Sequence, residues 1–246
     1  MTAAFGAVRL VRYRGGEVQP CHAHDEPAFS LLLCGELREE WRRDAFDLAG
    51  PACAWKPAGA RHATRFGPAG ALVASIPVTE GTARVMPAPG WHATVRAQRV
   101  GPLLRLALLS RNRAIQSDAV KDLLALADAP LSRTAAPDWL EIAREMLRED
   151  SWPVRIDDVA ARIGVHRVHL SRAFSACFGL PPSLYRLRAM AQRTLAAFGT
   201  TATLGEAAHE GGFADHSHAA RVLRRATGLR LGEIRRLTGE GYIRSS

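Results

Sequence analysis

The sequence is poor in lysine and in cysteine. Only Lys56 and Lys121 are lysines among its 33 basic residues, a preponderance of arginine that points to a GC-rich bacterial genome. The four cysteines show neither close pairing nor a CxxC spacing, which argues against a disulfide framework and against a zinc finger. They are Cys21, Cys34, Cys53 and Cys177. We therefore expect reduced thiols and a cytoplasmic protein.

Long apolar runs are absent as well. No stretch of the sequence approaches the roughly 20 apolar residues of a membrane-spanning helix. The N-terminus has no basic segment that leads into an apolar run, so a signal peptide is not expected either. The sequence predicts no membrane partner.

The chain has the size and the charge of a two-domain nucleic-acid-binding protein. Its 246 residues are 47% apolar, which is enough for two packed cores. The net charge is +9, and the residues from Ser151 onward contribute 14 arginines against 7 acidic residues. Most of the excess positive charge therefore lies in the C-terminal part, as phosphate binding requires.

The stretch from Arg155 to Gly179 reads as two short helices joined by a tight turn at Gly164. The second helix has an apolar stripe, and the opposite side is small, cationic and free of acidic residues. That side consists of Arg167, Val168, Ser171, Arg172 and Ser175. Such a face suits a DNA major groove, because arginine and serine can bond base edges or phosphates. The alternative is a helical hairpin with an ordinary solvated face.

The same unit recurs about 49 residues later, which indicates an internal repeat. Thr203 and Glu206 form a capping box for a short helix, and Asp215 caps a helix from His216 to Thr227. The exposed side of this helix is again cationic, with His216, Ser217, His218, Arg221, Arg224 and Arg225.

A longer helix joins the two units. It begins at Pro181 and Pro182 and is expected to end at Gly199. Its expected apolar stripe is Leu184, Leu187, Ala191, Leu195 and Phe198. A rigid spacer of this kind can set two recognition helices roughly 34 Å apart, about one turn of B-DNA.

Two segments resemble the AraC/XylS family of transcription regulators: VHLSRAFSACFGLPPSLYRLRAMAQR at 168–193 and GFADHSHAARVLRRATGL at 212–229. The resemblance covers roughly the last 100 residues, and it implies double-stranded DNA and RNA polymerase as partners. It also implies two sets of base-facing residues. They are Arg167, Val168, Ser171 and Arg172 in the first helix, and His216, Ser217, His218 and Arg221 in the second. His169 is interpreted as a packing residue.

The sequence departs from that family at three places. His166 stands where a serine-type cap is usual, so the first recognition helix is expected to begin less firmly. Ala219 and Leu223 replace large aromatic residues, which removes burial of about 1 to 3 kcal/mol each unless neighbours fill the space. Leu231 and Ile234 stand in the closing helix where Pro and Tyr are common. We therefore expect the second unit to be less stable or to read DNA less stringently.

The first 98 residues are rich in short alternating runs and in Gly and Pro, which indicates a β-rich domain. Expected strands are 28–33, 36–41 and 71–77. Gly16, His22, His24 and Gly35 keep the spacing of the first cupin motif, and Pro57, Gly59 and His62 fit the PxGxxH of the second. This part therefore resembles a cupin barrel, the sensor domain that many AraC-type regulators carry.

His22, His24 and His62 are candidate metal ligands. The first two are two residues apart and so share a strand face, and a barrel can bring the third beside them. Three imidazoles suit a divalent transition metal such as zinc, nickel, copper or iron. Ala28 stands where metal-binding cupins usually have a Glu. The alternative is that the histidines bond the backbone or line a ligand pocket.

The aromatic residues of the N-terminal part can line a small-molecule pocket in the barrel, and the alternative is that they form its plain core. They are Trp41, Trp55, Trp91 and Phe66. Residues 101–130 read as two amphipathic helices, which either pair with a second protomer or cap their own barrel. A linker is expected at 132–137 and a helix after it, with Trp139, Ile142, Ala143, Met146 and Leu147 as its apolar residues.

The predicted class is thus α+β: a cupin-like β-barrel sensor domain (1–98), a helical linker (99–136) and a DNA-binding domain with two helix-turn-helix motifs (137–246). The predicted function is a sequence-specific transcription regulator, not an enzyme, whose barrel senses a small molecule or a metal. The rival is a metal-dependent cupin enzyme fused to a helical domain.

Overall fold

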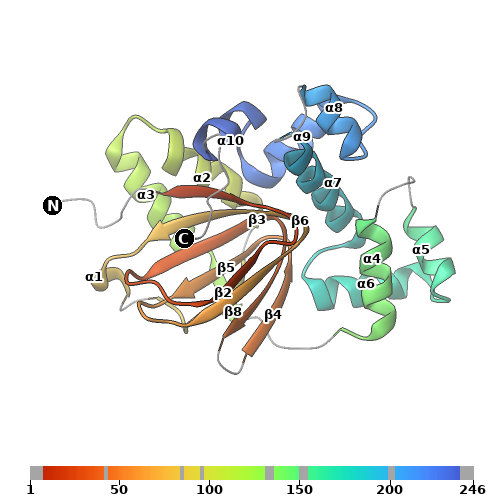
Figure 1. The fold of residues 1–246 in the computed structure, drawn as a ribbon, viewed down its shortest axis with the longest axis horizontal. Coiled ribbons are helices and arrows are strands. Elements are labelled where there is room, and N and C mark those ends of the chain that lie inside the picture. Colours follow the sequence, from red (N-terminus) through yellow and green to blue (C-terminus); the bar gives the residue numbers. More distant parts are fainter. Residues whose placement is uncertain are drawn as a thin grey trace.

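A strongly twisted sheet comes first in the chain and helices follow it (Figure 1). The structure, a computed structural model, describes residues 8–41, 44–83, 86–94, 97–130, 136–149, 155–198 and 203–238. The α+β class predicted from the sequence is confirmed. Residues 132–135 of the predicted linker and Gly199, the expected end of the spacer helix, lie outside the described residues.

The strands of the described residues form one eight-stranded sheet. They are β1 (Arg9–Tyr13), β2 (Val18–His22), β3 (Ala28–Trp41), β4 (Asp44–Ala49), β5 (Ala52–Lys56), β6 (His62–Pro77), β7 (Gly90–Thr94) and β8 (Ala127–Pro130). The long antiparallel strands β3 and β6 form its centre. The order is β1-β6-β3-β5-β7-β8, with β2 on β6 and β4 on β3. The sheet does not close into the predicted barrel, since no pairing joins the end strands β1 and β8 in the part of the chain described.

The predicted strands 28–33 and 36–41 are in fact one strand, β3. Its pairing with β6 is irregular at Leu32–Cys34 and Gly35–Leu37, so the strand bends there without ending. Gly35 has φ +90°, and a Cβ at this position would lie 2.1 Å from the carbonyl oxygen of Gly70. A glycine is therefore needed for the close approach of β3 and β6, and it does not mark a turn.

The sheet has one face toward helices and one face toward an inner cavity. Phe29, Leu31 and Leu33 of β3 pack into a core that includes helix residues, whereas Leu32 and Leu37 belong to a second core on the other face. Burial on both faces explains why Leu31–Cys34 is a continuous apolar run with no alternation.

The helices flank the sheet on one side and extend away from it (Figure 1). They are α1 (Glu80–Ala83), the 3₁₀ helix η1 (Ala97–Arg99), α2 (Val100–Leu109), α3 (Arg113–Leu124), α4 (Asp138–Arg148), α5 (Ile156–Arg162), α6 (Arg167–Phe178), α7 (Pro182–Ala197), α8 (Leu204–Glu210), α9 (His216–Thr227) and α10 (Leu231–Thr238). The two helices expected in 101–130 are α2 and α3, but Ala127–Pro130 returns to the sheet as β8. No helix among the described residues combines the length and hydropathy needed to cross a bilayer.

The two repeated units differ in how they are buried. We call α5 with α6 the first helix pair and α8 with α9 the second helix pair. The first pair has a core of its own, built with α4 and Tyr185 of α7. The second pair has a small core around Phe213 and Ala219, but Leu223 and Ala226 of α9 and Ile234 of α10 join the core of the sheet. One helix of the second pair, α9, therefore packs against the N-terminal sheet.

Candidate nucleic-acid interface and histidine cluster

The first helix pair has the predicted local structure. Gly164 has φ +73° in the turn, and Val159 and Ala160 are buried. His166 was expected to begin α6 less firmly, but it is an effective cap, because its Nδ1 accepts a hydrogen bond of 3.2 Å from the backbone N–H of Val168. The free N–H groups of a helix start need such acceptors, and an imidazole nitrogen supplies one here.

The predicted base-facing residues of α6 lie on its outer side. Arg167, Val168 and Arg172 are exposed and Ser171 is partly buried. Val168 is 47% exposed. Arg167 Nη1 lies 3.4 Å from the Asp157 carboxylate of α5, so a phosphate would compete with this ion pair.

His169 was interpreted as a packing residue. It is exposed to solvent, but its ring stacks on Trp139 of α4, with ring centroids 5.4 Å apart and an interplanar angle of 23°. The contact fixes α6 against α4, so His169 has a packing role although it is not buried.

The second helix pair is capped as predicted. Thr203 Oγ1 accepts from the backbone N–H of Glu206, and Glu206 accepts from that of Thr203, at 3.2 and 3.0 Å. Asp215 accepts from the backbone N–H of His218 at 2.7 Å. This hydrogen bond lowers the pKa of Asp215, with a contribution from the charge of Arg221. All four predicted base-facing residues of α9 are exposed: His216, Ser217, His218 and Arg221.

The space left by the small residues of α9 is filled. Ala219 and Leu223 are both fully buried, and Leu223 packs with sheet and α2 residues. At Gly228 (φ +76°), a Cβ would lie 2.0 Å from the carbonyl oxygen of Gly101 on α2. Ala219 packs with Met190 of α7 and Phe213, so both positions lie in cores that neighbours complete. The lower stability expected of the second unit stays a prediction.

The spacer helix α7 contributes residues to three separate cores. It contributes Tyr185 to the core of the first helix pair, Met190 to that of the second, and Ala191 and Leu195 to the core of the sheet. Leu184 of the predicted stripe is instead 39% exposed. The helix is buried on several sides because three cores meet on it.

The three candidate metal ligands are brought together. His22 and His62 face each other in the register of β2 and β6, with ring centroids 4.5 Å apart, and His24 lies 4.9 and 5.2 Å from them. One ligand nitrogen of each lies within 4.8 Å of the others. The prediction that these residues meet is confirmed, and metal binding by them stays a prediction.

Backbone carbonyls orient two of these rings. His22 Nδ1 lies 2.8 Å from the carbonyl oxygen of Pro20, and His62 Nδ1 lies 3.0 Å from that of Ala60. In the neutral ring, donation from Nδ1 leaves the Nε2 lone pair free for a metal, as in many metal centres. Burial lowers the pKa of His62 to about 4, and it also lowers the pKa of His24. Both rings are therefore neutral at pH 7, the state in which imidazole binds a metal.

Glu39 and Lys56, which the sequence reasoning missed, lie beside the cluster. Glu39 is 1% exposed and accepts hydrogen bonds from Lys56 Nζ at 2.6 Å, Thr64 at 3.1 Å and Trp91 at 2.9 Å, and also from Trp41. Burial alone would raise the pKa of Glu39, but the charge of Lys56 holds it below its usual value. The sequence does contain a sign of this position, because residues two apart on a strand share a face and Glu39 is two residues from the apolar Leu37.

These residues line a cavity of about 490 Å³ on the inner face of the sheet. Of the four predicted pocket aromatics, Phe66 and Trp91 line it. Trp55 packs into the core on the other face, and Trp41 lies against His62 with ring centroids 5.8 Å apart. The cavity has the size and the mixed lining of a small-molecule site.

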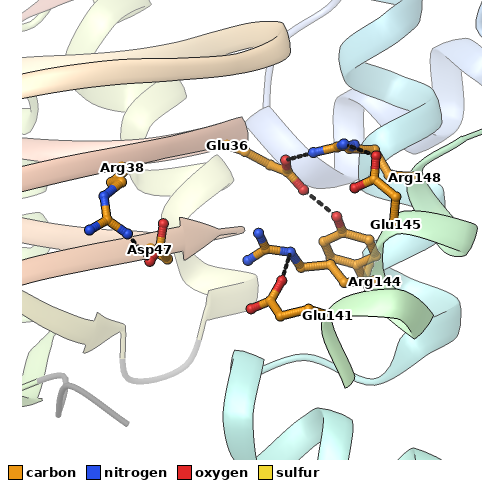
Figure 2. A network of polar contacts seen from close by, with 8 residues as sticks. Glu36, Arg38, Asp47, Glu141, Arg144, Glu145 and Arg148 are labelled. Atoms are coloured by element: carbon orange, nitrogen blue, oxygen red, sulfur yellow. Dashed lines mark hydrogen bonds and ion pairs between the residues drawn. The ribbon is translucent and has the colours of Figure 1, made fainter. Parts of the chain in front are cut away.

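Polar contacts join the outer face of the sheet to α4 and α7, which pack against the first helix pair (Figure 2). Glu36 of β3 accepts hydrogen bonds from Tyr185 of α7 and, at 3.2 Å, from Arg148 of α4. Arg148 also contacts Glu145 of its own helix. Burial raises the pKa of Tyr185, and the Glu36 charge raises it further, so Tyr185 stays a donor.

Comparisons with known proteins identify the C-terminal part. Residues 140–237 match the family model described as "Helix-turn-helix domain". A search of the curated proteins found no match.

Three solved structures show weaker likenesses. ToxT from Vibrio cholerae is 10% identical over 96% of this chain and 100% of its own, with a TM-score of 0.41. The C-terminal domain of AraT, a response regulator from Geobacillus stearothermophilus, is 17% identical over 42% and 88%, with a TM-score of 0.39. A cupin-2 domain containing protein from Shewanella frigidimarina is 18% identical over 32% and 74%, with a TM-score of 0.27.

Proposed function

We propose that this chain is a DNA-binding transcription regulator that reads two successive major grooves with α6 and α9, because residues 140–237 match a helix-turn-helix domain. The residues proposed to face base edges are Arg167, Val168, Ser171 and Arg172 of α6, and His216, Ser217, His218 and Arg221 of α9. The N-terminal sheet is proposed to carry the sensing site.

The observation that carries the proposal for DNA is the chemistry of the two helix faces. Each recognition helix begins at a capped N-terminus and presents arginine at its outer side, and its buried side belongs to a core. Arginine donates two hydrogen bonds to a guanine edge, and serine bonds either a base or a phosphate. Neither helix carries a carboxylate between its first and last residue, so no acidic group on it opposes the phosphates.

The sensing part of the proposal has two components. A divalent transition metal would be held by the imidazoles of His22, His24 and His62. The bound metal would cross-link strands β2 and β6. An effector would occupy the cavity of about 490 Å³ beside it, next to Lys56 and Trp91. Either ligand would stabilise one arrangement of the sheet.

The partners proposed beyond DNA follow from the class of protein. A regulator that changes transcription contacts RNA polymerase, and a homodimer is proposed through α2 and α3, where Leu106 and Ile115 are each 44% exposed. A cytoplasmic location fits DNA as the partner.

Hydroxyl-radical footprinting of the full chain on a selected duplex tests this function. Two protected patches about 10 base pairs apart on the same side of the duplex would support two grooves read by one protomer. A single protected patch would mean that only one helix contacts the duplex. Uniform protection on duplexes of any sequence would mean that the chain does not recognise a specific sequence.

A further inference from the structure

Arg193 lies on the spacer helix α7, which contacts both α4 and α8 (Figure 1). Its guanidinium bonds both of these helices. Nη1 donates a hydrogen bond to the backbone carbonyl of Arg148, the last residue of α4. Nη2 donates to the carbonyl oxygen of Gly211, the residue that ends α8, at 3.2 Å. One side chain therefore joins the ends of two helices that are far apart in the sequence.

The two acceptors have the same chemical character, because both are carbonyls at the C-terminal end of a helix. The last carbonyl groups of a helix have no partner within it, so those of Arg148 and Gly211 need a donor from outside. A cation at this place also faces the negative end of each helix dipole. A guanidinium suits the position, since its two terminal nitrogens are held in one rigid plane and can serve two acceptors at once.

Each acceptor belongs to a different helix pair. Leu147, the neighbour of Arg148, is buried in the core that α4 forms with α5 and α6. Gly211 begins the turn of the second helix pair, in which Phe213 shares a core with Ala219 of α9. The carbonyl of Arg148 is thus fixed relative to α6, and that of Gly211 is fixed relative to α9.

The turn at Gly211 lies so close to α7 that a side chain has no room there. A Cβ at Gly211 would lie 2.0 Å from Oγ1 of Thr194 and 3.0 Å from the carbonyl oxygen of Met190, both on α7. Thr194 is fully buried, and its hydroxyl donates to that same carbonyl at 3.1 Å. The glycine therefore brings the end of α8 within reach of Arg193, the residue before Thr194.

The hydrogen bonds of Arg193 differ in kind from the apolar contacts that α7 makes with the two helix pairs. Tyr185 packs into the core of the first pair, and Met190 packs into that of the second. Apolar contact has no preferred direction, whereas an N–H···O bond weakens steeply below an angle of about 120°. Packing holds the helix pairs on α7, and the two bonds of Arg193 limit how far they can turn or slide.

We propose that Arg193 is a positioning residue for DNA reading: it fixes the distance and the angle between α6 and α9, so that the chain selects one spacing between two sequence elements. The inference rests on the proposed reading of two grooves. One additional base pair moves the second element by about 3.4 Å and turns it by about 34° around the duplex axis. A protein whose two helices cannot follow this shift recognises the spacing in addition to the bases.

The first measurement is the affinity of the full chain for duplexes that carry both sequence elements at spacings of about 8, 10 and 12 base pairs. We expect the wild type to prefer one spacing by about ten-fold or more, and Arg193→Met to reduce this preference to about two-fold or less. Affinity for a duplex with a single element should be unchanged. Arg193→Lys should lie between, because its single nitrogen cannot occupy both donor positions.

The second measurement needs no DNA. Spin labels attached to keto amino acids at Ala176 of α6 and at Ala214, just before α9, report the distance between the two helices by pulsed electron spin resonance. Both positions are exposed. We expect a narrow distance distribution in the wild-type background and a broader one in Arg193→Met.

Arg188→Met is the matched control, because Arg188 is an arginine of the same helix that donates instead to the carbonyl oxygen of Leu33 in the sheet, at 2.8 Å. Its distance distribution and spacing preference should match those of the wild type. Urea melts of each variant establish that it is folded.

Three results would overturn the role of Arg193. They are a distance distribution in Arg193→Met as narrow as that of the wild type, equal broadening in Arg188→Met, and a spacing preference that Arg193→Met retains. A wild type that binds every spacing equally, together with the expected broadening in Arg193→Met, would overturn the reading of two grooves and still support the fixed geometry of the two helices.

Discussion

The hydroxyl of Tyr185 on α7 donates a hydrogen bond to the carboxylate of Glu36 on β3, 149 positions away in the sequence. Arg148 of α4 donates to the same carboxylate, whose side chain is 17% exposed. This contact of the sheet with α4 and α7 is polar, whereas Leu223 of α9 and Ile234 of α10 bury apolar surface against the sheet. The helices around the first helix pair and those around the second are therefore joined to the sheet by different kinds of contact.

Tyr185→Phe should lower the free energy of unfolding by about 1 to 3 kcal/mol, because a partly buried carboxylate loses a donor. Urea denaturation of the two proteins measures the difference. The control is Asp47→Asn, which breaks the exposed pair of Asp47 with Arg38 in Figure 2 and should cost less than about 1 kcal/mol. A loss in the control as large as in Tyr185→Phe would contradict the role given to Glu36.

Gly179 and Gly228 offer a matched pair, since each ends a recognition helix in the left-handed region, with φ +71° and +76°. Alanine at Gly179 meets no atom within 4 Å, so Gly179→Ala should cost only the backbone strain of about 1 to 2 kcal/mol. Gly228→Ala should cost about 2 to 5 kcal/mol, because its Cβ also collides with Gly101. Equal losses in thermal or urea melts would mean that α9 does not pack against α2 as described.

The stability of the metal-free protein should depend on pH through His62. Its pKa is about 4 in the folded chain against 6.5 for a free histidine. Between these values the unfolded chain binds a proton that the folded chain does not, so stability is fully present above about pH 6.5 and falls as the pH falls toward about 4. Urea melts in EDTA over this range should show a shallower slope for His62→Gln. His209→Gln, an exposed residue on α8, should leave the slope unchanged.

Metal binding is tested by dialysis against Zn²⁺, elemental analysis and thermal melts. We expect one equivalent of metal and a stabilisation of about 2.7 kcal/mol when free metal is 100 times its dissociation constant. His62→Ala should remove both effects, since it deletes one of three ligands, and His209→Ala should keep them. A wild type that retains no metal after dialysis would end the metal proposal and leave the inner cavity as the candidate effector site.

The helix ends could be predicted from the sequence because they depend on neighbours in the chain. The capping box of Thr203 with Glu206 and the cap at Asp215 involve residues three positions apart, and both are present. The meeting of His22 with His62 was also predictable, since it follows from a family motif.

The strands and the contacts between distant segments were harder to predict. Burial of β5 on both faces removes the alternation that marks a strand. Gly35 reads as a turn signal, but it serves a close crossing inside β3. The packing around the small Ala219 was not predictable either, because Met190 of α7 and Phe213 complete it. The Glu36 and Tyr185 contact leaves no local signal, because it depends on how α7 docks on the sheet.

The reading of two grooves is tested most directly by letting the full chain select duplexes from a random DNA pool. The affinity for the selected duplex is then measured as a function of salt concentration. We predict two sequence elements about 10 base pairs apart and a steep salt dependence. Arg172→Ala should lose one element and Arg221→Ala the other, each at a cost of about 1 to 3 kcal/mol. Recovery of a single element, unchanged by Arg221→Ala, would contradict the account.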